Sequence, residues 1–446
     1  MKSQGLTFIH LSDIHFNKNS GDSYDLDSDL RHEILEDIGR EKNTVGCVSG
    51  VLISGDIAFS GKKSEYKKAK VFLTDLCCLL EIPETSIYCV PGNHDVDQKI
   101  TKESHSLDRA QIAIETASDL DSEISGFLRD FNSKSMMYSH IHEYNNFSAQ
   151  FNCNIDATDP MWKNDLKLND ESILRLYGLN TVIISSYRDK WDRQMILGKY
   201  QLPQNEFGVT YIGLGHHPPE VWKDSDETKT TLLNRIHIQL YGHKHSQNIV
   251  KQNNSLILFS GATHPFRSEK KWRPRYNWLS VYVDRVAGKR SLITKVYPRV
   301  LDESDNCFIA DSNSCKGNNF IEYSLNLDRW DAPKTASWDV EKVPEVDKIE
   351  NMDDQTGDII IANPIRTLVY RFFGLSYTTR SSILNGLALL HDKDDGVEHT
   401  KLFRILLKRA EEKAVLPQLW GEIEKAHGDC KYTANPFKDN ISQAGD

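Results

Sequence analysis

The sequence has no run of about 18 apolar residues, the length at which a helix can cross a bilayer. Its first residues, MKSQGLTFIHLSD, also lack the apolar stretch and small-residue cleavage site of a secretory signal peptide. None of its eight cysteines forms a CxxC pair, so neither a disulfide framework nor a thiolate zinc site is indicated. We therefore expect free thiols, no membrane segment and a cytoplasmic location.

The chain has 446 residues, of which 39% are hydrophobic and 26% are charged, as is typical of a globular protein. This length exceeds one ordinary hydrophobic core and predicts at least two domains. The formal net charge of −10 argues against tight, non-specific binding to nucleic acid, because such binding depends on neutralising phosphates with Lys and Arg.

Short apolar segments alternate with polar helical stretches through the first 300 residues. Two helical patterns, at 27–40 and 64–80, separate the early apolar segments. This alternation predicts an α/β fold with a layered sheet core, in which chemistry lies in loops beyond the strand ends. The segments that we expect to be buried strands are 7–11, 51–54, 86–90, 181–185, 210–214, 237–241 and 256–260.

Two regions near this core have a different composition. Residues 97–175 are polar, prone to form helices and poor in strand signals, which fits either a cap over the site or a peripheral helical insertion. Residues 266–300 carry ten Lys and Arg but only two Asp and Glu, interleaved with aromatic residues. Such a strip could hold a polyanion, but we favour a twisted hairpin with a charged solvent face.

The remainder of the chain predicts a tethered helical domain. After a β and loop extension at 301–330, residues 331–358 contain nine acidic and three basic residues without periodicity, the composition of an extended linker. Asn363 and Pro364 offer an N-cap and a first helical position, and four short amphipathic patterns follow within 359–433. Residues 434–446 form a tail. We expect the helices to bind a protein partner or to mediate oligomerisation.

Carboxylate, amide and imidazole side chains follow five of the expected strands, in the fragments HLSDIH, ISGDIAFSG, VPGNHDV, GLGHHPP and YGHKHS. Any one fragment is weak evidence, since a single His at a strand end is usually structural. Together, and without thiolates, they suit Mn, Fe, Zn or Ni rather than a structural zinc ion. In an extended segment the i, i+2 pairs would share a face. The residues are Asp13, His15, Asp56, Asn93, His94, Asp95, His216, His217, His243 and His245.

These fragments resemble the calcineurin-like metallophosphoesterases, whose motifs are DxH, GD, GNH[D/E], a later H and GHxH. All five occur here in that order between residue 6 and about residue 265. The resemblance implies a four-layer αββα sandwich within residues 1–300. The form HHPP and the preceding fragment LGKYQLP look most like the branch that hydrolyses cyclic nucleotides and glycerophosphodiesters.

The resemblance also implies a role for each motif residue. Two divalent metal ions share Asp56, and a hydroxide bridging them attacks phosphorus in line. His94 is the expected general acid, and Asp95 either orients it or closes the turn. The ligands of the first ion would be Asp13, His15, Asp56 and His245. Those of the second ion would be Asp56, Asn93, His216 and His243.

Other histidines fit the ligand set less well. We place His217 outside it, behind the ligands or facing substrate, and His264 is a candidate substrate contact. His10 should pack or cap within the first strand. His140 and His142 lie in a helix-prone segment, where i, i+2 side chains point apart, so we do not expect them to bind metal.

The favoured function is hydrolysis of a phosphoester, most of all a phosphodiester, of small or medium size. The alternatives are a metal-dependent DNA or RNA nuclease, and a phosphoesterase tethered by its helical domain to a bacterial signalling or defence complex. That domain resembles the effector-associated adaptor domains of bacterial conflict systems. A protein phosphatase is disfavoured, because GDIAFSG stands where that branch has GDxVDRG.

Overall fold

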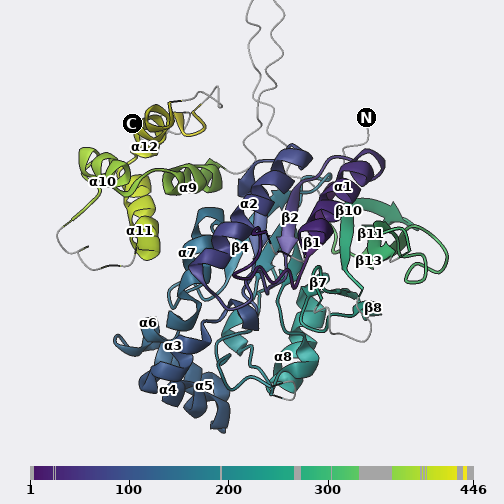
Figure 1. Ribbon diagram of the computed structural model, residues 1–446, viewed down its shortest axis with the longest axis horizontal. Helices are drawn as coiled ribbons and strands as arrows, with labels where there is room; N and C mark the ends of the chain where they lie inside the picture. Colours follow the sequence, from purple (N-terminus) through teal and green to yellow (C-terminus); the bar gives the residue numbers. More distant parts are fainter. Residues whose placement is uncertain are drawn as a thin grey trace, which may run out of the picture. The chain divides into compact units, whose positions relative to one another are not determined.

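The computed structural model describes residues 5–23, 25, 27–190, 193–265, 273–302, 304–330, 364–391, 394, 397, 399–428 and 435–438. The chain divides into two compact units, Met1–Arg329 and Trp330–Asp446 (Figure 1). Within the described ranges, no helix combines the length and the apolar character needed to cross a membrane.

The first sheet of the larger unit joins both ends of its sequence. Three parallel strands near the N-terminus lie beside an antiparallel group that comes from residues 275–326. The strand order is β12-β11-β10-β1-β2-β3, and β13 also pairs with β11. The bounds are β1 Leu6–Leu11, β2 Gly50–Ile53, β3 Ile87–Cys89, β10 Arg275–Val286, β11 Lys289–Asp302, β12 Cys307–Ala310 and β13 Ile321–Asn326.

The second sheet has the order β4-β5-β6-β7-β9-β8. Its central strands are parallel and almost fully buried, as expected of strands covered on both faces. The bounds are β4 Trp162–Lys167, β5 Ile173–Gly178, β6 Val209–Leu214, β7 Ile238–Tyr241, β8 Gln247–Gln252 and β9 Ser255–Ser260.

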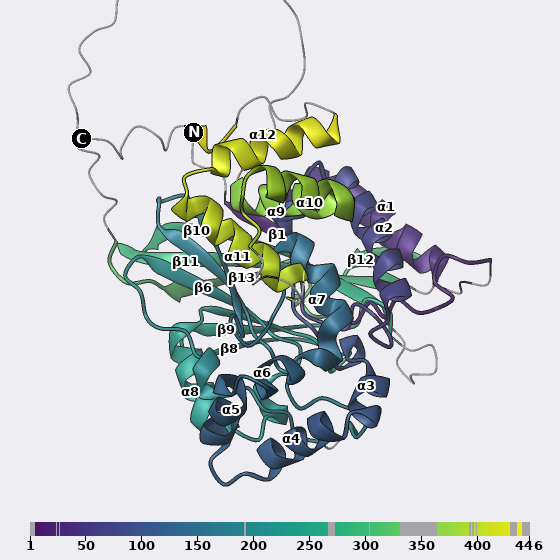
Figure 2. The ribbon, with the colours of Figure 1, turned by 90° about the vertical axis from the view of Figure 1, so that its left-hand side faces the viewer.

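The two sheets pack on each other, and helices lie beside both of them. The indole of Trp162 on β4 donates to the carbonyl oxygen of Cys89 on β3 at 2.8 Å. Gln247 on β8 donates to Asn277 on β10 at 2.6 Å. Helices α1 (Ser28–Val45) and α2 (Lys63–Leu80) lie beside the first sheet, and α8 (Ser225–Arg235) lies beside the second (Figure 2). The expected layered α/β fold is therefore confirmed.

One expected strand is wrong. Residues 181–185 contain a turn and no strand. Val182, Ile183 and Ile184 are fully buried, but the carbonyl groups of Val182 and Ile183 contact side chains instead of a neighbouring strand. Gln111 donates to the carbonyl oxygen of Ile183 at 3.2 Å, and His140 Nε2 lies 2.9 Å from that of Val182. The apolar run thus predicted burial correctly, but burial does not require strand pairing.

The polar region 97–175 is helical only in its first part. Its last part contains β4 and the first half of β5, so the expectation of few strands is wrong there. The burial of β4 alternates along the polar sequence WKNDLK, as in an edge strand, and such a strand has no apolar run to reveal it. The helices are α3 Gln98–Glu103, α4 His105–Thr116, α5 Leu120–Arg129, α6 Ser133–Met136 and α7 His142–Ser148.

The basic strip is a hairpin over its described part. Strands β10 and β11 pair from Arg275 opposite Val300 to Val286 opposite Lys289. Residues 266–272 of the strip lie outside the described ranges, as do the linker 331–358 and Asn363.

The smaller unit is all-helical where it is described, as expected. Its core surrounds the fully buried Trp420, and the rings of Phe372 and Phe403 stack with centroids 4.0 Å apart. The helices are α9 Pro364–Gly374, α10 Tyr377–Gly386, α11 His399–Glu412 and α12 Leu416–His427. Residues 435–438 are the described part of the expected tail.

Candidate metal centre

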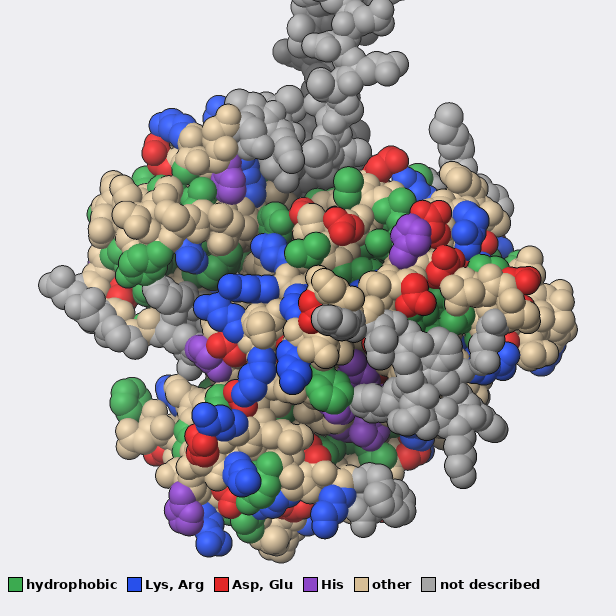
Figure 3. Space-filling view, in the orientation of Figure 1, with side chains coloured by type: hydrophobic (Ala, Val, Ile, Leu, Met, Phe, Trp, Pro, Cys, Tyr) green, Lys and Arg blue, Asp and Glu red, His purple; other side chains and the backbone are tan. Residues whose placement is uncertain are grey.

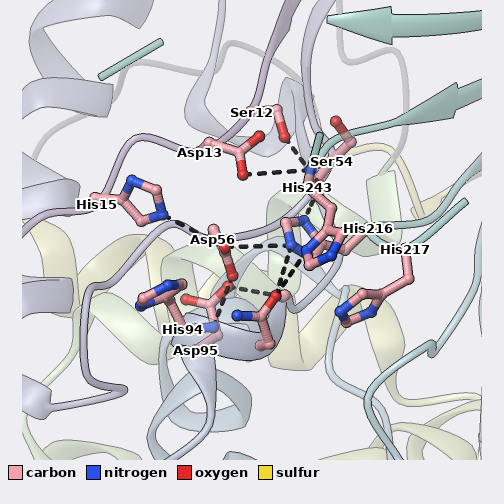
Figure 4. Close-up of polar contacts among 12 residues, drawn as sticks. Ser12, Asp13, His15, Ser54, Asp56, His94, Asp95, His216, His217 and His243 are labelled. Carbon is pink, nitrogen blue, oxygen red and sulfur yellow. Dashed lines mark hydrogen bonds and ion pairs between the residues drawn. The ribbon is translucent and has the colours of Figure 1, made fainter. Parts of the chain in front are cut away.

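Loops that follow strands of both sheets meet at one edge of the sandwich. The backbone amide of Asp13, after β1, donates to the carbonyl oxygen of Gly55, after β2, at 3.1 Å. The amide of Gly242, after β7, likewise donates to His216, after β6, at 3.1 Å. The structure thereby brings the residues of all five motifs into one cluster (Figure 4).

Five of the expected ligands have a left-handed backbone. Their φ angles are 52° at Asp13, 55° at His15, 53° at Asp56, 66° at His243 and 50° at His245. Residues other than Gly rarely adopt this conformation, and it concentrates at functional sites. The i, i+2 pairs do converge, but from tight turns beyond the strand ends. The extended geometry that we expected for them is wrong.

Two glycines allow the loops to approach this closely. A Cβ atom at Gly92 would overlap the carboxylate of Asp56, and one at Gly242 would overlap the hydroxyl group of Ser12. Any larger residue at either position would therefore push a candidate ligand loop out of place.

The first donor group comprises Asp13, His15 and His245, whose donor atoms all lie within 4.8 Å of one another. His245 Nε2 lies 3.4 Å from Asp13 Oδ1. Asp13 is fully buried, and its Oδ2 has no hydrogen-bond partner among the described residues. A buried carboxylate oxygen of this kind needs a cation or a proton nearby, which fits a metal ion.

The second donor group surrounds Asn93, whose Oδ1 lies 3.1 Å from His216 Nε2 and 3.2 Å from His243 Nδ1. His216 Nδ1 faces the carbonyl oxygen of Ser54 at 2.9 Å and therefore carries a hydrogen. A neutral His216 then directs the lone pair of Nε2 at oxygen atoms. That arrangement is favourable only with a proton or a metal cation between them.

Asp56 joins the two groups. Its Oδ2 lies 3.4 Å from His15 Nε2 and 3.2 Å from His216 Nε2, while its Oδ1 accepts from the backbone amide of His94 at 2.7 Å. Two ligand atoms about 2.1 Å from one ion, at roughly 90–110° to each other, lie about 3.0–3.4 Å apart. The measured separations match this range, so the donor set fits metal ions on both sides of Asp56.

The pKa values of the clustered residues shift in different directions. Burial disfavours the ionised form of Asp56, but His216 and His94 outweigh it and hold the pKa of Asp56 well below its usual value. Burial also disfavours protonation of His216, yet the charge of Asp56 raises its pKa to about 9. Burial, together with His216, lowers the pKa of His243 to about 4. The anionic carboxylate of Asp56 thus favours a positive charge at His216, whereas the ring of His243 stays neutral.

His94 lies at the open side of the cluster and is only partly buried. Its Nδ1 is 2.9 Å from the carbonyl oxygen of Phe59, so Nδ1 carries a hydrogen in the neutral ring. The ring centroid is 4.8 Å from that of His15 and 5.2 Å from that of Phe59. Histidine side chains reach the surface near the centre of the face shown in Figure 3.

Asp95 points back into the protein. Its carboxylate accepts hydrogen bonds from the amides of Ile57 at 3.1 Å, Ala58 at 2.8 Å and Gly92 at 2.9 Å, and from the hydroxyl group of Tyr66 at 2.8 Å. Burial, with repulsion from the nearby Asp56 carboxylate, raises the pKa of Asp95 to about 6. These contacts correspond to the turn-closing role, one of the two that the sequence left open.

The remaining histidines occupy distinct positions. His264 is buried behind the first loop, where its Nδ1 lies 2.6 Å from the carbonyl oxygen of Ile14. His10 Nε2 lies 2.9 Å from Ser54 Oγ, so His10 packs inside the sheet as expected. His217 is buried, and its ring centroid is 4.5 Å from that of His243.

His140 and His142 lie apart from the cluster. His140 contacts the 181–185 segment, and His142 Nε2 lies 2.9 Å from Asn146 Nδ2 on its own helix. Sequence reasoning missed Ser54 and Phe59, which orient His216 and His94. They act through backbone carbonyl groups, so their side chains carry no signal.

Comparison with known proteins supports two assignments. Residues 6–247 match the protein-family model described as calcineurin-like phosphoesterase, and residues 364–425 match the GTPase-associated adaptor domain. A search of curated proteins found no significant match.

Several solved structures are similar to this chain. Vacuolar protein sorting 29 from Cryptosporidium parvum has 13% identity and a TM-score of 0.30, covering 73% of this chain and 100% of that one. An uncharacterised predicted phosphoesterase from Streptococcus pneumoniae has 12% identity and a TM-score of 0.28, covering 72% and 97%. GAP50 of Plasmodium has 11% identity and a TM-score of 0.36, covering 73% and 90%. Because the family model spans more than half of its residues, this chain belongs to the calcineurin-like phosphoesterase family.

Proposed function

We propose that the protein is a phosphodiesterase that depends on two divalent metal ions, Mn, Fe, Zn or Ni. The observation that carries this proposal is the position of Asp56 Oδ2, within 3.4 Å of a donor nitrogen from each group. The proposed ligands are Asp13, His15, Asp56, Asn93, His216, His243 and His245.

When bound, such ions acidify a water molecule and offset the charge that develops on the phosphoryl oxygens. Asp56 contributes an anion between two cations and so reduces their mutual repulsion. Its burial and its hydrogen bond from the amide of His94 hold the carboxylate in one orientation. Left-handed turns hold four of the other ligands before any substrate arrives, so little rearrangement is needed. These four are Asp13, His15, His243 and His245.

His94 is the proposed general acid. The carbonyl oxygen of Phe59 holds the hydrogen on Nδ1, so Nε2 is the atom that exchanges a proton with the leaving oxygen. His94 follows the proposed ligand Asn93 directly and remains partly exposed. It can therefore reach a substrate that is bound at the ions. Asp95 supports this loop through the backbone.

Among the described residues of the basic strip, 273–300, no contact favours the nuclease alternative. Four of its described basic residues pair with acids of the chain itself. Arg290 pairs with Asp170 at 2.7 Å, and Lys295 pairs with Glu322 at 3.5 Å. The other two pairs are Arg275 with Asp311 and Arg299 with Asp37. Cations already neutralised in this way contribute little to binding a polyanion, so we favour a small phosphodiester as substrate.

The helical unit is the proposed site of protein partnering, supported by its match to an adaptor domain. Recruitment to a signalling or defence complex would explain why a phosphoesterase carries it. We further propose a cytoplasmic location, because the described cysteines are free thiols, as is usual in a reducing compartment.

The test is metal-dependent turnover of bis-p-nitrophenyl phosphate, compared with the monoester p-nitrophenyl phosphate. Purified protein should bind two ions per chain and hydrolyse the diester faster. Asp56→Asn should lose at least about 10³-fold in kcat/KM. Asp284→Asn, which alters an exposed carboxylate on β10, is the matched control and should retain activity. Unchanged turnover in Asp56→Asn, or a wild type without bound metal or hydrolysis, would rule the proposal out.

A further inference from the structure

His217 is a buried imidazole, and one of its two ring nitrogens could bind a ligand. The residue is only 1% exposed, and its Nε2 has no hydrogen-bond partner among the described residues. Leaving a buried ring nitrogen without a partner is costly. Such an atom usually marks a water, a ligand or an ion that completes its surroundings.

Thr181 contacts the ring of His217, and Thr181 and Trp222 hold its backbone. His217 Nδ1 lies 3.0 Å from Thr181 Oγ1, and the same hydroxyl group accepts from the backbone amide of His217 at 3.2 Å. The indole of Trp222 donates to the carbonyl oxygen of His217 at 3.0 Å. Since Thr181 occupies Nδ1, Nε2 is the nitrogen available to a ligand. This arrangement resembles the support of a metal-binding His, whose second nitrogen is normally hydrogen-bonded.

The neighbours of His217 are two other imidazoles. Donor atoms of His216, His217 and His243 lie within 4.8 Å of one another. Their ring centroids are 4.8 Å apart for His216 and His217, 4.5 Å for His217 and His243, and 5.4 Å for His216 and His243 (Figure 4).

These separations fit three rings around a single ion. A ring bound through nitrogen at about 2.1 Å has its centre about 3.2 Å from the metal. Two such rings at roughly 90–115° to each other have centres about 4.5–5.4 Å apart. All three measured separations fall within this range.

We propose that His217 binds the second metal ion through Nε2, as a third imidazole beside His216 and His243. This assignment rests on the two-ion centre proposed above and adds a ligand to it. The second ion would then have three nitrogen and two oxygen donors from the protein, while the first has two of each. Nitrogen-rich sites favour Zn or Ni over Mn. The two sites should therefore prefer different metals, with the second site more selective for Zn.

The test is metal binding, measured without any activity assay. Apoprotein is titrated calorimetrically with Zn²⁺, and Co²⁺-loaded protein is examined by visible absorption. His217→Phe keeps a buried planar ring but removes the donor. We expect the wild type to bind two Zn²⁺ ions. In His217→Phe the affinity of one of them should fall more than about 100-fold, beyond the loss that a merely supporting residue causes, and the Co²⁺ bands should shift.

Two further variants make the result specific. His140→Phe removes an equally buried histidine that contacts Val182 rather than the cluster, and it should bind both ions normally. Thr181→Val should weaken the same Zn²⁺ step by a smaller factor, because Thr181 only positions the ring. Circular dichroism confirms that each variant is folded.

A folded His217→Phe with wild-type Zn²⁺ affinities and an unchanged Co²⁺ spectrum would overturn the assignment. So would a loss below about 100-fold with an unchanged spectrum, because a residue that only supports a ligand costs about 10–100-fold in metal affinity. The result of this metal titration can be distinguished from the result of the activity test of the proposed function. A wild type that binds two ions but hydrolyses no phosphodiester refutes the activity and leaves the assignment of His217 open to the same titration.

Discussion

Asp56 Oδ2 lies 3.2 Å from His216 Nε2, although the two residues belong to different sheets and to distant parts of the chain. Asp56 follows β2 in the first sheet, and His216 follows β6 in the second. The contact exists because both sheets end at the same edge of the sandwich. The candidate metal centre therefore spans the interface between the sheets. Its geometry depends on how the two sheets pack.

Metal ions should stabilise the protein against unfolding. The unfolded chain cannot assemble the two donor groups, so an ion at about 100 times its Kd would add about 2.7 kcal/mol per site. Melting followed by circular dichroism should show a higher Tm with Zn²⁺ or Mn²⁺ than with EDTA. Asp13→Asn should reduce that shift. Equal Tm values in both conditions would contradict metal binding by this cluster.

Replacing His94 should affect poor leaving groups most. A general acid contributes about 10²–10⁴-fold when the leaving oxygen must be protonated, and much less for a phenolate that leaves as an anion. His94→Ala should therefore slow hydrolysis of an alkyl diester far more than that of bis-p-nitrophenyl phosphate. His142→Ala, which changes an exposed histidine on α7, is the control. An equal loss on both substrates would argue against proton donation.

Asp95 should matter for stability, because its carboxylate satisfies three backbone amides and the Tyr66 hydroxyl group. Asp95→Asn places an NH₂ group where only acceptors fit, and we expect a loss of about 2–4 kcal/mol in the free energy of unfolding. Tyr66→Phe removes one donor and should cost about 1–2 kcal/mol. Urea unfolding measures both values. If Asp95→Asn left the free energy of unfolding unchanged, other contacts would have to hold the turn.

The helical unit should weaken in acid through Asp394. Hydrogen bonds from Arg409, one of them 2.8 Å long, lower the pKa of Asp394 to about 2. Because the folded pKa lies below the ordinary value of about 3.9, the ionised carboxylate stabilises the fold above about pH 4. That contribution disappears as the pH falls toward 2.

The Tm difference between wild type and Asp394→Asn should accordingly be largest near pH 6 and shrink on acidification. Glu411→Gln, which changes an exposed acid on α11, the helix that carries Arg409, should show no such trend. A difference independent of pH would mean that the ion pair with Arg409 does not contribute through its charge.

Several features of the site could be predicted because they depend on local sequence. Short apolar runs predicted β1, β2, β3, β6, β7 and β9, and the polar residues after five of them are those found in the cluster. The length of an apolar run does not predict a strand where a buried segment is unpaired or where a paired strand is polar. Residues 181–185 are as apolar as a strand but bond to side chains, and the polar edge strand β4 has no apolar run.

Sequence by itself determined the donor types, their order along the chain and the all-helical character of the second unit, since these follow from residue identity and local periodicity. Only the tertiary structure decided that Asp56 lies between the donor groups, that Asp95 faces the backbone, and that His217 has a buried Nε2 without a hydrogen-bond partner in the described part of the chain. Each of these depends on which loops meet when two sheets pack. That meeting is set by long-range contacts between residues far apart in the chain, which no local pattern encodes.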